Sequence, residues 1–149
     1  LKPGGRVPYV QLQDRSGAST SLSQVAQGAP SLVVLTDVDC TYCDNELKAL
    51  RQMAAPGTPR VVAVSVSKPG GYATLAARHP ALAVYDDVNG AFRGKLGLKG
   101  VPVTLAVGAD GTVRDVKFGL QNGSQLRALM DAASAPGQLT SAGGEAPAP

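Results

Sequence analysis

Residues 31–50, SLVVLTDVDCTYCDNELKAL, contain the pattern that decides the fold. The opening run SLVVLT is apolar, rich in β-branched residues and of strand length, which predicts a central strand covered on both faces. After Cys43, apolar residues recur at helical spacing until Pro56-Gly57, which predicts an amphipathic helix. Cys40 and Cys43 therefore lie where a buried strand gives way to a helix.

Strands and helices alternate around this stretch. An Asp110-Gly111 turn between the last two strands predicts an antiparallel hairpin, whereas the earlier alternation favours parallel crossovers. We therefore expect an α/β fold in which helices flank a central mixed β-sheet, with an extra N-terminal strand. The expected strands are 8–13, 31–36, 60–66, 82–85, 103–107 and 112–118; the expected helices are 21–26, the stretch after Cys43, 70–78, a weak one over 88–96, and one from Asn122 or Ser124 to Ala133.

The chain has the length of one domain, because its 149 residues can bury a sizeable core. From Ala135 onward it consists mainly of Ala, Gly, Pro and Ser, with little to bury. We expect a single domain over residues 1–134 and an Ala/Gly/Pro-rich disordered tail over residues 135–149.

Composition excludes several classes of protein. The net charge of +3 is modest and the basic residues are scattered, so no stripe for nucleic acid is present. No apolar run approaches the roughly 20 residues that cross a bilayer. The chain begins at Leu1 rather than Met, which a removed signal peptide or membrane anchor, or simple trimming, would explain.

The two cysteines have the spacing of a redox pair. Cys40 falls in the N-cap region of the expected helix, where unpaired amides and the helix dipole stabilise a thiolate and make it nucleophilic. Cys43 follows one turn later, close enough to form a disulfide. The carboxylate of Asp39 opposes this effect, because a negative charge beside Cys40 raises the pKa of its thiol.

Other interpretations of the pair remain open. In a thiol peroxidase, peroxide would oxidise Cys40 to a sulfenic acid that Cys43 resolves. In a non-catalytic module the thiols would bind a metal, although a tetrahedral site needs further ligands and the chain has a single histidine, His79. His79 precedes a proline, and we interpret it as a surface residue.

Gly100-Val101-Pro102 precedes the expected strand 103–107 and provides a second signal, since a proline there marks a special turn. With the strand that leads into the cysteine pair and the Asp110-Gly111 hairpin, it makes the chain resemble the thioredoxin superfamily. Within it the chain is similar to the extracytoplasmic TlpA-like thiol–disulfide oxidoreductases, including those of cytochrome c maturation. The resemblance covers roughly residues 7–133.

The resemblance implies roles for further residues. It places a cis-proline, here Pro102, beside the cysteines, and the backbone of Val101 would receive an incoming substrate strand. Glu46 matches a glutamate that lies beside the thiols and influences their proton traffic. Tyr42, inside the cysteine motif, is a candidate for contact with a partner, because exposed tyrosines favour interfaces.

The chain departs from the family pattern at several positions. Asp39 stands where the family usually has tryptophan, and Val34 stands where cytosolic thioredoxins have a buried aspartate. Thr36 does not have the spacing that thiol peroxidases show before their cysteine. The carboxylates of Asp37, Asp39 and Asp44 surround the pair and either form a solvated rim or tune its chemistry.

Together these observations predict a thiol–disulfide oxidoreductase that exchanges disulfides with protein substrates through Cys40-Thr41-Tyr42-Cys43, without an organic cofactor or metal. The partners would be disulfide-containing or dithiol proteins, with a membrane thiol reductase as electron donor and no nucleic acid. The resemblance implies an extracytoplasmic protein of the periplasm or cell envelope, anchored to the membrane through a removed N-terminal segment, and we expect a monomer.

Overall fold

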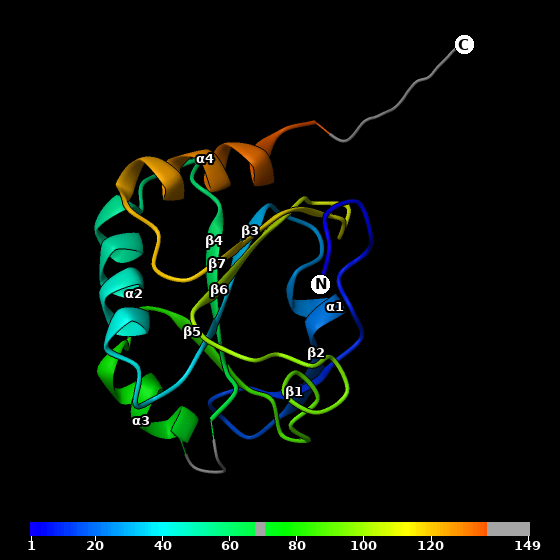
Figure 1. Ribbon diagram of the computed structural model, residues 1–149, viewed down its shortest axis with the longest axis vertical. Coiled ribbons are helices and arrows are strands. Elements are labelled where there is room, and N and C mark those ends of the chain that lie inside the picture. The colour runs from blue at the N-terminus through cyan, green and yellow to red at the C-terminus, as the bar shows by residue number, and fades with distance from the viewer. Residues whose placement is uncertain (68–70, 137–149) are drawn as a thin grey trace.

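The computed structural model describes residues 1–67 and 71–136, which form one mixed seven-stranded sheet with helices on both faces (Figure 1). The predicted disordered tail lies outside the described residues, apart from Ala135 and Pro136. In chain order the elements are β1 (Gln11–Gln13), β2 (Ser19–Ser21), α1 (Leu22–Val25), β3 (Ser31–Thr36), α2 (Thr41–Met53), β4 (Arg60–Ser65), α3 (Gly71–Arg78), β5 (Ala83–Asp86), β6 (Val103–Val107), β7 (Val113–Phe118) and α4 (Gly123–Ser134).

The strand order is β2-β1-β5-β4-β3-β6-β7. Strand β3 runs parallel to β4 and antiparallel to β6, and β7 closes the hairpin that Asp110-Gly111 predicts. The N-terminal addition is a hairpin of β1 and β2, so the expected single strand over 8–13 is shorter and has a partner. The predicted α/β fold with a mixed sheet is confirmed.

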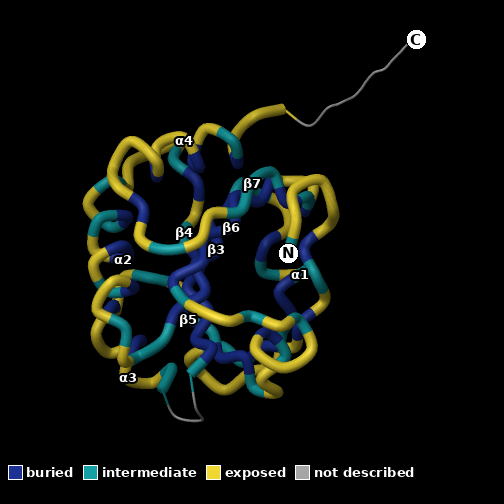
Figure 2. Tube along the Cα trace, in the orientation of Figure 1, coloured by how far each residue is buried: buried dark blue, intermediate teal, exposed yellow. Residues whose placement is uncertain are grey.

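Two cores lie on opposite faces of the sheet. The central strands between them are coloured as buried in Figure 2. One face carries α2, α3 and α4, whose apolar stripes pack on Leu32 and Val34 of β3. The other face carries α1, the N-terminal segment and the loop 87–101, packed on Val33 and Leu35. All six residues of β3 are buried, as its unbroken apolar run predicts.

The weak helix expected over 88–96 does not form, and this segment consists of turns. Gly90 and Gly97 adopt positive φ angles of 62° and 69°, which interrupt a helical path. The carboxylate of Asp87 accepts hydrogen bonds from the amides of Ala91 and Phe92, at 3.0 and 2.9 Å. The ring of Phe92 is fully buried, so this loop is a fixed part of the core.

Candidate active site

The reactive pair lies where β3 passes into α2. Cys40 is the N-cap of α2, with extended backbone angles, and its sulfur accepts a hydrogen bond from the Cys43 amide at 3.1 Å. The two residues form a disulfide with their Cα atoms 5.2 Å apart. Cys40 is half-buried and Cys43 is fully buried. One sulfur can therefore meet a partner while the other waits behind it.

The proline loop stands against Cys40. Because β6 is antiparallel to β3, with Leu35 opposite Val103, the start of β6 lies at the end of the sheet where α2 begins. The Val101–Pro102 peptide bond is cis, as the resemblance implies. The carbonyl oxygen of Val101 lies 4.0 Å from the sulfur of Cys40. The structure thus brings together Cys40, Cys43, Val101 and Pro102.

Glu46 lies one turn after Cys43 on the buried face of α2, with no exposed surface. The hydroxyl of Thr104 donates a hydrogen bond to one carboxylate oxygen, and the Gln121 amide donates to the other at 3.1 Å. Burial raises the pKa of Glu46, and these two hydrogen bonds oppose that rise. The carboxyl of Glu46 thus keeps its proton to a higher pH than an exposed glutamic acid does, and it lies one helical turn from Cys43.

Thr104 and Gln121 are site residues that the sequence analysis missed. The one available signal was a hydroxyl in the otherwise apolar strand 103–107. Thr104 lies directly opposite Val34 in the β3–β6 register, so both share one face of the sheet. Val34 is the position where the aspartate of cytosolic thioredoxins would stand, and here α2 supplies a buried carboxylate to that neighbourhood through Glu46.

The three aspartates around the pair have different surroundings. Burial would raise the pKa of Asp37, but hydrogen bonds from the Asp39 amide and the Ser67 hydroxyl, together with the guanidinium of Arg93, lower it below its usual value. Asp44 is bound by Arg78 at 2.7 Å. Asp39 is exposed. The carboxylate that remains open to solvent is thus the one beside Cys40 in the sequence.

The interpretation of His79 as a surface residue is wrong, because its side chain is fully buried. Its Nε2 lies 2.9 Å from Asp44 Oδ1, and its own backbone amide closes the last turn of α3 on Leu75. The ring therefore ties the end of α3 to the first turn of α2. This contact joins residues 35 apart, and a local pattern of a histidine before a proline gives no sign of it.

Tyr42 exposes 62% of its surface on the first turn of α2, as a partner contact requires. Among residues 1–67 and 71–136, no group of three His, Cys, Asp or Glu side chains lies close enough together to hold a metal ion. No helix in the same ranges is both long and apolar enough to cross a membrane.

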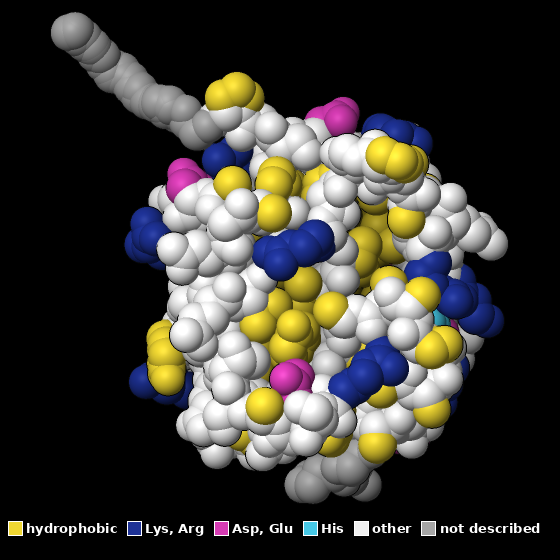
Figure 3. All heavy atoms as spheres, turned by 180° about the vertical axis from the view of Figure 1, so that it is seen from behind, with side chains coloured by type: hydrophobic (Ala, Val, Ile, Leu, Met, Phe, Trp, Pro, Cys, Tyr) yellow, Lys and Arg dark blue, Asp and Glu magenta, His cyan; other side chains and the backbone are white. Residues whose placement is uncertain are grey.

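A cavity of about 370 Å³ lies at the other ends of the parallel strands β4 and β5, away from the cysteines. Figure 3 shows apolar side chains gathered in a hollow on the rear face of the molecule. The cavity is lined by Val25, Leu50, Arg51, Ala54, Pro59, Arg60, Val61, Val62, Ala81, Leu82, Ala83 and Tyr85. It contains none of the cysteine-site residues.

Comparison with solved structures finds the same fold in other proteins. The protein from Chlorobium tepidum assigned as the thiol:disulfide interchange protein DsbE is 25% identical, with a TM-score of 0.74 over 89% of this chain and 98% of that one. The thio-disulfide isomerase from Thermus thermophilus is 22% identical, with a TM-score of 0.69 over 91% of this chain and 100% of that one. StoA from Bacillus subtilis shares the fold at 14% identity, with a TM-score of 0.60 over 82% of this chain and 96% of that one.

Among curated proteins, no sequence matches this chain. The model of the thioredoxin-like domain family matches residues 23–134, three quarters of the chain. This match includes the cysteine pair, the buried glutamate and the cis-proline. The chain belongs to the thioredoxin-like domain family.

Proposed function

We propose that this protein is a thiol–disulfide oxidoreductase that exchanges disulfides with protein substrates through Cys40 and Cys43. The observation that carries the proposal is the position of Cys40. Its sulfur is half-buried at the N-terminus of α2, the Cys43 sulfur is bonded to it, and the Val101 carbonyl lies 4.0 Å away. A partner backbone that pairs with Val101 would present its own sulfur to Cys40.

In the reducing direction the dithiol form of the protein acts first. The Cys40 thiolate attacks one sulfur of a partner disulfide, a mixed disulfide forms, and the other partner sulfur leaves as a thiolate. Cys43 then loses its proton and attacks the Cys40 sulfur, which releases the second partner thiolate. Two electrons pass to the partner, and the Cys40–Cys43 disulfide remains. The oxidising direction is the reverse of these steps.

Glu46 is the proposed proton carrier for Cys43. Cys43 is buried, so its proton has no direct path to water, whereas the carboxyl of Glu46 lies one turn away on the same face of α2. The raised pKa of Glu46 suits such a group, because this carboxyl binds a proton more tightly than an exposed glutamic acid does and can still release it. Thr104 and the Gln121 amide hold this carboxyl in place.

The cellular setting is proposed on the resemblance. The protein would act outside the cytoplasm as a monomer, on disulfide-containing or dithiol proteins such as those of cytochrome c maturation. A membrane thiol reductase would return electrons to the Cys40–Cys43 pair. The support is the family pattern and the similarity to the Chlorobium tepidum protein assigned as DsbE.

Trapping of the mixed disulfide tests the proposal. Because Cys43 resolves the intermediate, a reduced Cys43→Ser protein should accumulate a covalent adduct with a disulfide-containing substrate such as insulin or a scrambled protein. A Cys40→Ser protein should form none. Insulin reduction by Cys40→Ser at the wild-type rate would exclude Cys40 as the attacking group. Peroxide oxidation of the wild type orders of magnitude faster than that of free cysteine would instead identify a thiol peroxidase.

A further inference from the structure

A second cavity, of about 390 Å³, adjoins the cysteine site. It is lined by Leu1, Leu96, Gly97, Leu98, Lys99, Gly100 and Phe118. Gly100 continues directly into Val101, so the wall of the cavity leads to the carbonyl that faces Cys40. A substrate strand that pairs with Val101 would therefore pass the mouth of this cavity within a few residues of its reacting cysteine.

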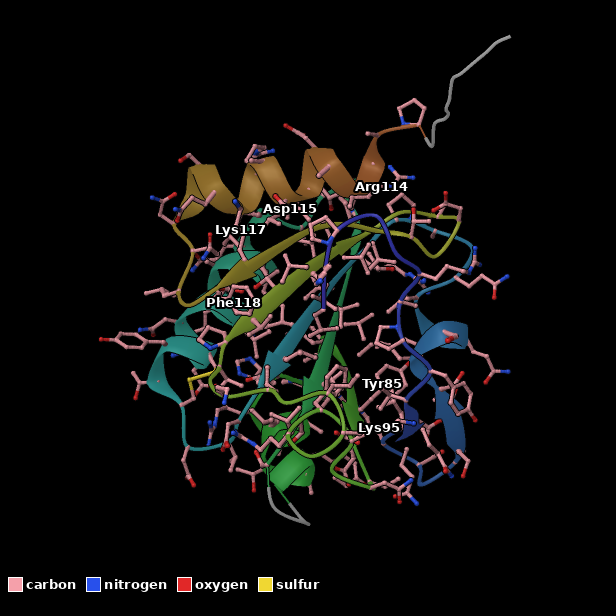
Figure 4. The ribbon with its side chains drawn as sticks, turned by 45° about the vertical axis from the view of Figure 1, so that its right-hand side comes forward. Tyr85, Lys95, Arg114, Asp115, Lys117 and Phe118 are labelled. Carbon is pink, nitrogen blue, oxygen red and sulfur yellow. A yellow bond between two sulfur atoms is a disulfide. The ribbon has the colours of Figure 1, made fainter. Side chains whose placement is uncertain are left out.

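Phe118 gives the cavity an exposed apolar wall. It ends β7, opposite Val103 in the β6–β7 register, and the next amide, that of Gly119, donates to the Pro102 carbonyl at 2.8 Å. Phe118 nevertheless exposes 70% of its surface. Figure 4 labels its side chain, together with that of Lys95 on the loop. A large aromatic side chain left in solvent beside a reactive site is typical of a contact that a partner completes.

The loop that forms the other wall is strongly cationic. Arg93, Lys95 and Lys99 are exposed, and no acidic residue occurs between Asp87 and Asp110. Arg93 is paired with Asp37, but neither Lys95 nor Lys99 forms an ion pair with any residue that the structure describes. Asp39, an exposed carboxylate next to Cys40 in the sequence, belongs to the β3–α2 loop and not to this one. The loop that lines the cavity therefore carries two positive charges that are unpaired within the described part of the chain, Lys99 in the cavity wall and Lys95 four residues before it.

We propose that this cavity, together with Lys99 in its wall and Lys95 on the same loop, selects the protein substrate: an extended, acidic segment that places a bulky apolar side chain against Phe118 within a few residues of its cysteine. The inference rests on the proposed function. The apolar side chain fills the cavity, while Lys95 and Lys99 attract the flanking carboxylates and speed the encounter. Cys40 then reacts with the cysteine that Val101 has aligned.

Short peptides can test both parts. Each carries one cysteine as a mixed disulfide with thionitrobenzoate, so attack by Cys40 on the peptide sulfur releases a coloured thiolate. In each peptide, the second residue before the cysteine and the second residue after it are both leucine or both serine. The residues outside these positions are all glutamate or all lysine. Stopped-flow rates with the fully reduced protein then separate the apolar contribution from the charge contribution.

For the charge contribution, we expect the acidic leucine peptide to react about ten-fold faster than the basic one at low salt, and the difference to shrink in 0.5 M salt. Lys95→Glu combined with Lys99→Glu should abolish or reverse this preference. Arg127→Glu, an exposed charge reversal on α4, should leave it unchanged. Equal wild-type rates for the two peptides would overturn the proposed selectivity.

For the apolar contribution, Phe118→Ser should slow the leucine peptide about three- to ten-fold and leave the serine peptide unaffected. The control is Leu120→Ser, an exposed apolar residue that does not line the cavity. An equal loss in both variants, or none in Phe118→Ser, would overturn the role of the cavity. Fast but unselective release would leave the proposed function standing, whereas a reduced wild type that releases no colour from any peptide would contradict that function itself.

Discussion

At the scale of single residues, Glu46 couples the chemistry of the site to the stability of the protein. Its carboxyl is fully buried, and burial raises its pKa while the Thr104 and Gln121 hydrogen bonds lower it. The native state therefore binds this proton more tightly than the unfolded chain does. The free energy of unfolding must fall as pH rises from the ordinary pKa of a glutamic acid through the raised one.

Glu46→Gln should remove this pH dependence. A glutamine can accept from the Gln121 amide and donate to the Thr104 hydroxyl, so the variant should fold normally and gain stability relative to wild type as pH rises. Glu46→Ala leaves both partners buried without a hydrogen bond and should lose about 1–3 kcal/mol. Urea unfolding from pH 4 to pH 8 measures these differences, and parallel curves for wild type and Glu46→Gln would contradict the argument.

The carboxylate of Asp39 is expected to influence the pKa of the Cys40 thiol. Its exposed carboxylate neighbours Cys40 in the loop before α2, whereas Asp37 and Asp44 are held by Arg93 and Arg78. Asp39→Asn should lower the pKa of the reduced Cys40 thiol, by about half a pH unit or less because water screens the charge. The pH dependence of iodoacetamide alkylation measures it. Asp131→Asn on α4 is the control, and a midpoint that does not move would show that Asp39 has no influence.

At the scale of elements, the sequence identified those whose pattern is local. The apolar run of β3, the stripe of α2 and the Asp110-Gly111 hairpin all lie where they were predicted. The helix predicted over 88–96 was wrong. The conformation of this segment is fixed by hydrogen bonds to the carboxylate of Asp87 and by burial of Phe92, and helical periodicity reveals neither. The site residues divide in the same way. The cysteines and Pro102 belong to local motifs and could be predicted, whereas the positions of Thr104 and His79 depend on contacts with Glu46 and Asp44, which are distant in the sequence.

The α2–α3 junction depends on one such contact. Asp44 accepts from Arg78 and lies 2.9 Å from the buried ring of His79. Asp44→Ala would leave that ring without its partner, and should lower the free energy of unfolding by about 1–3 kcal/mol. Asp131→Ala, exposed on α4, should change it by less than about 0.5 kcal/mol. Urea unfolding at pH 7 compares them, and equal stabilities would show that the contact contributes nothing.

At the scale of the whole molecule, the sheet separates two hydrophobic cores, and its central strands contribute side chains to both. Phe92 packs with the N-terminal hairpin on one face, and Leu129 of α4 packs with α2 on the other. Both side chains are fully buried. The cysteine pair follows β3, which contributes side chains to both cores. Packing on both faces of the sheet therefore holds the strand that leads into the site.

Paired substitutions can show whether the faces are independent in energy. Leu129→Ala should cost about 2–5 kcal/mol, and Phe92→Leu about 1–2 kcal/mol, because each leaves a cavity in its own core. Since these side chains lie in different cores, their effects should add to within about 0.5 kcal/mol. Both variants should still unfold in a single transition. Urea unfolding followed by circular dichroism measures this, and a second transition in Phe92→Leu would mean that the 87–101 loop and the N-terminal hairpin fold apart from the sheet that holds the cysteines.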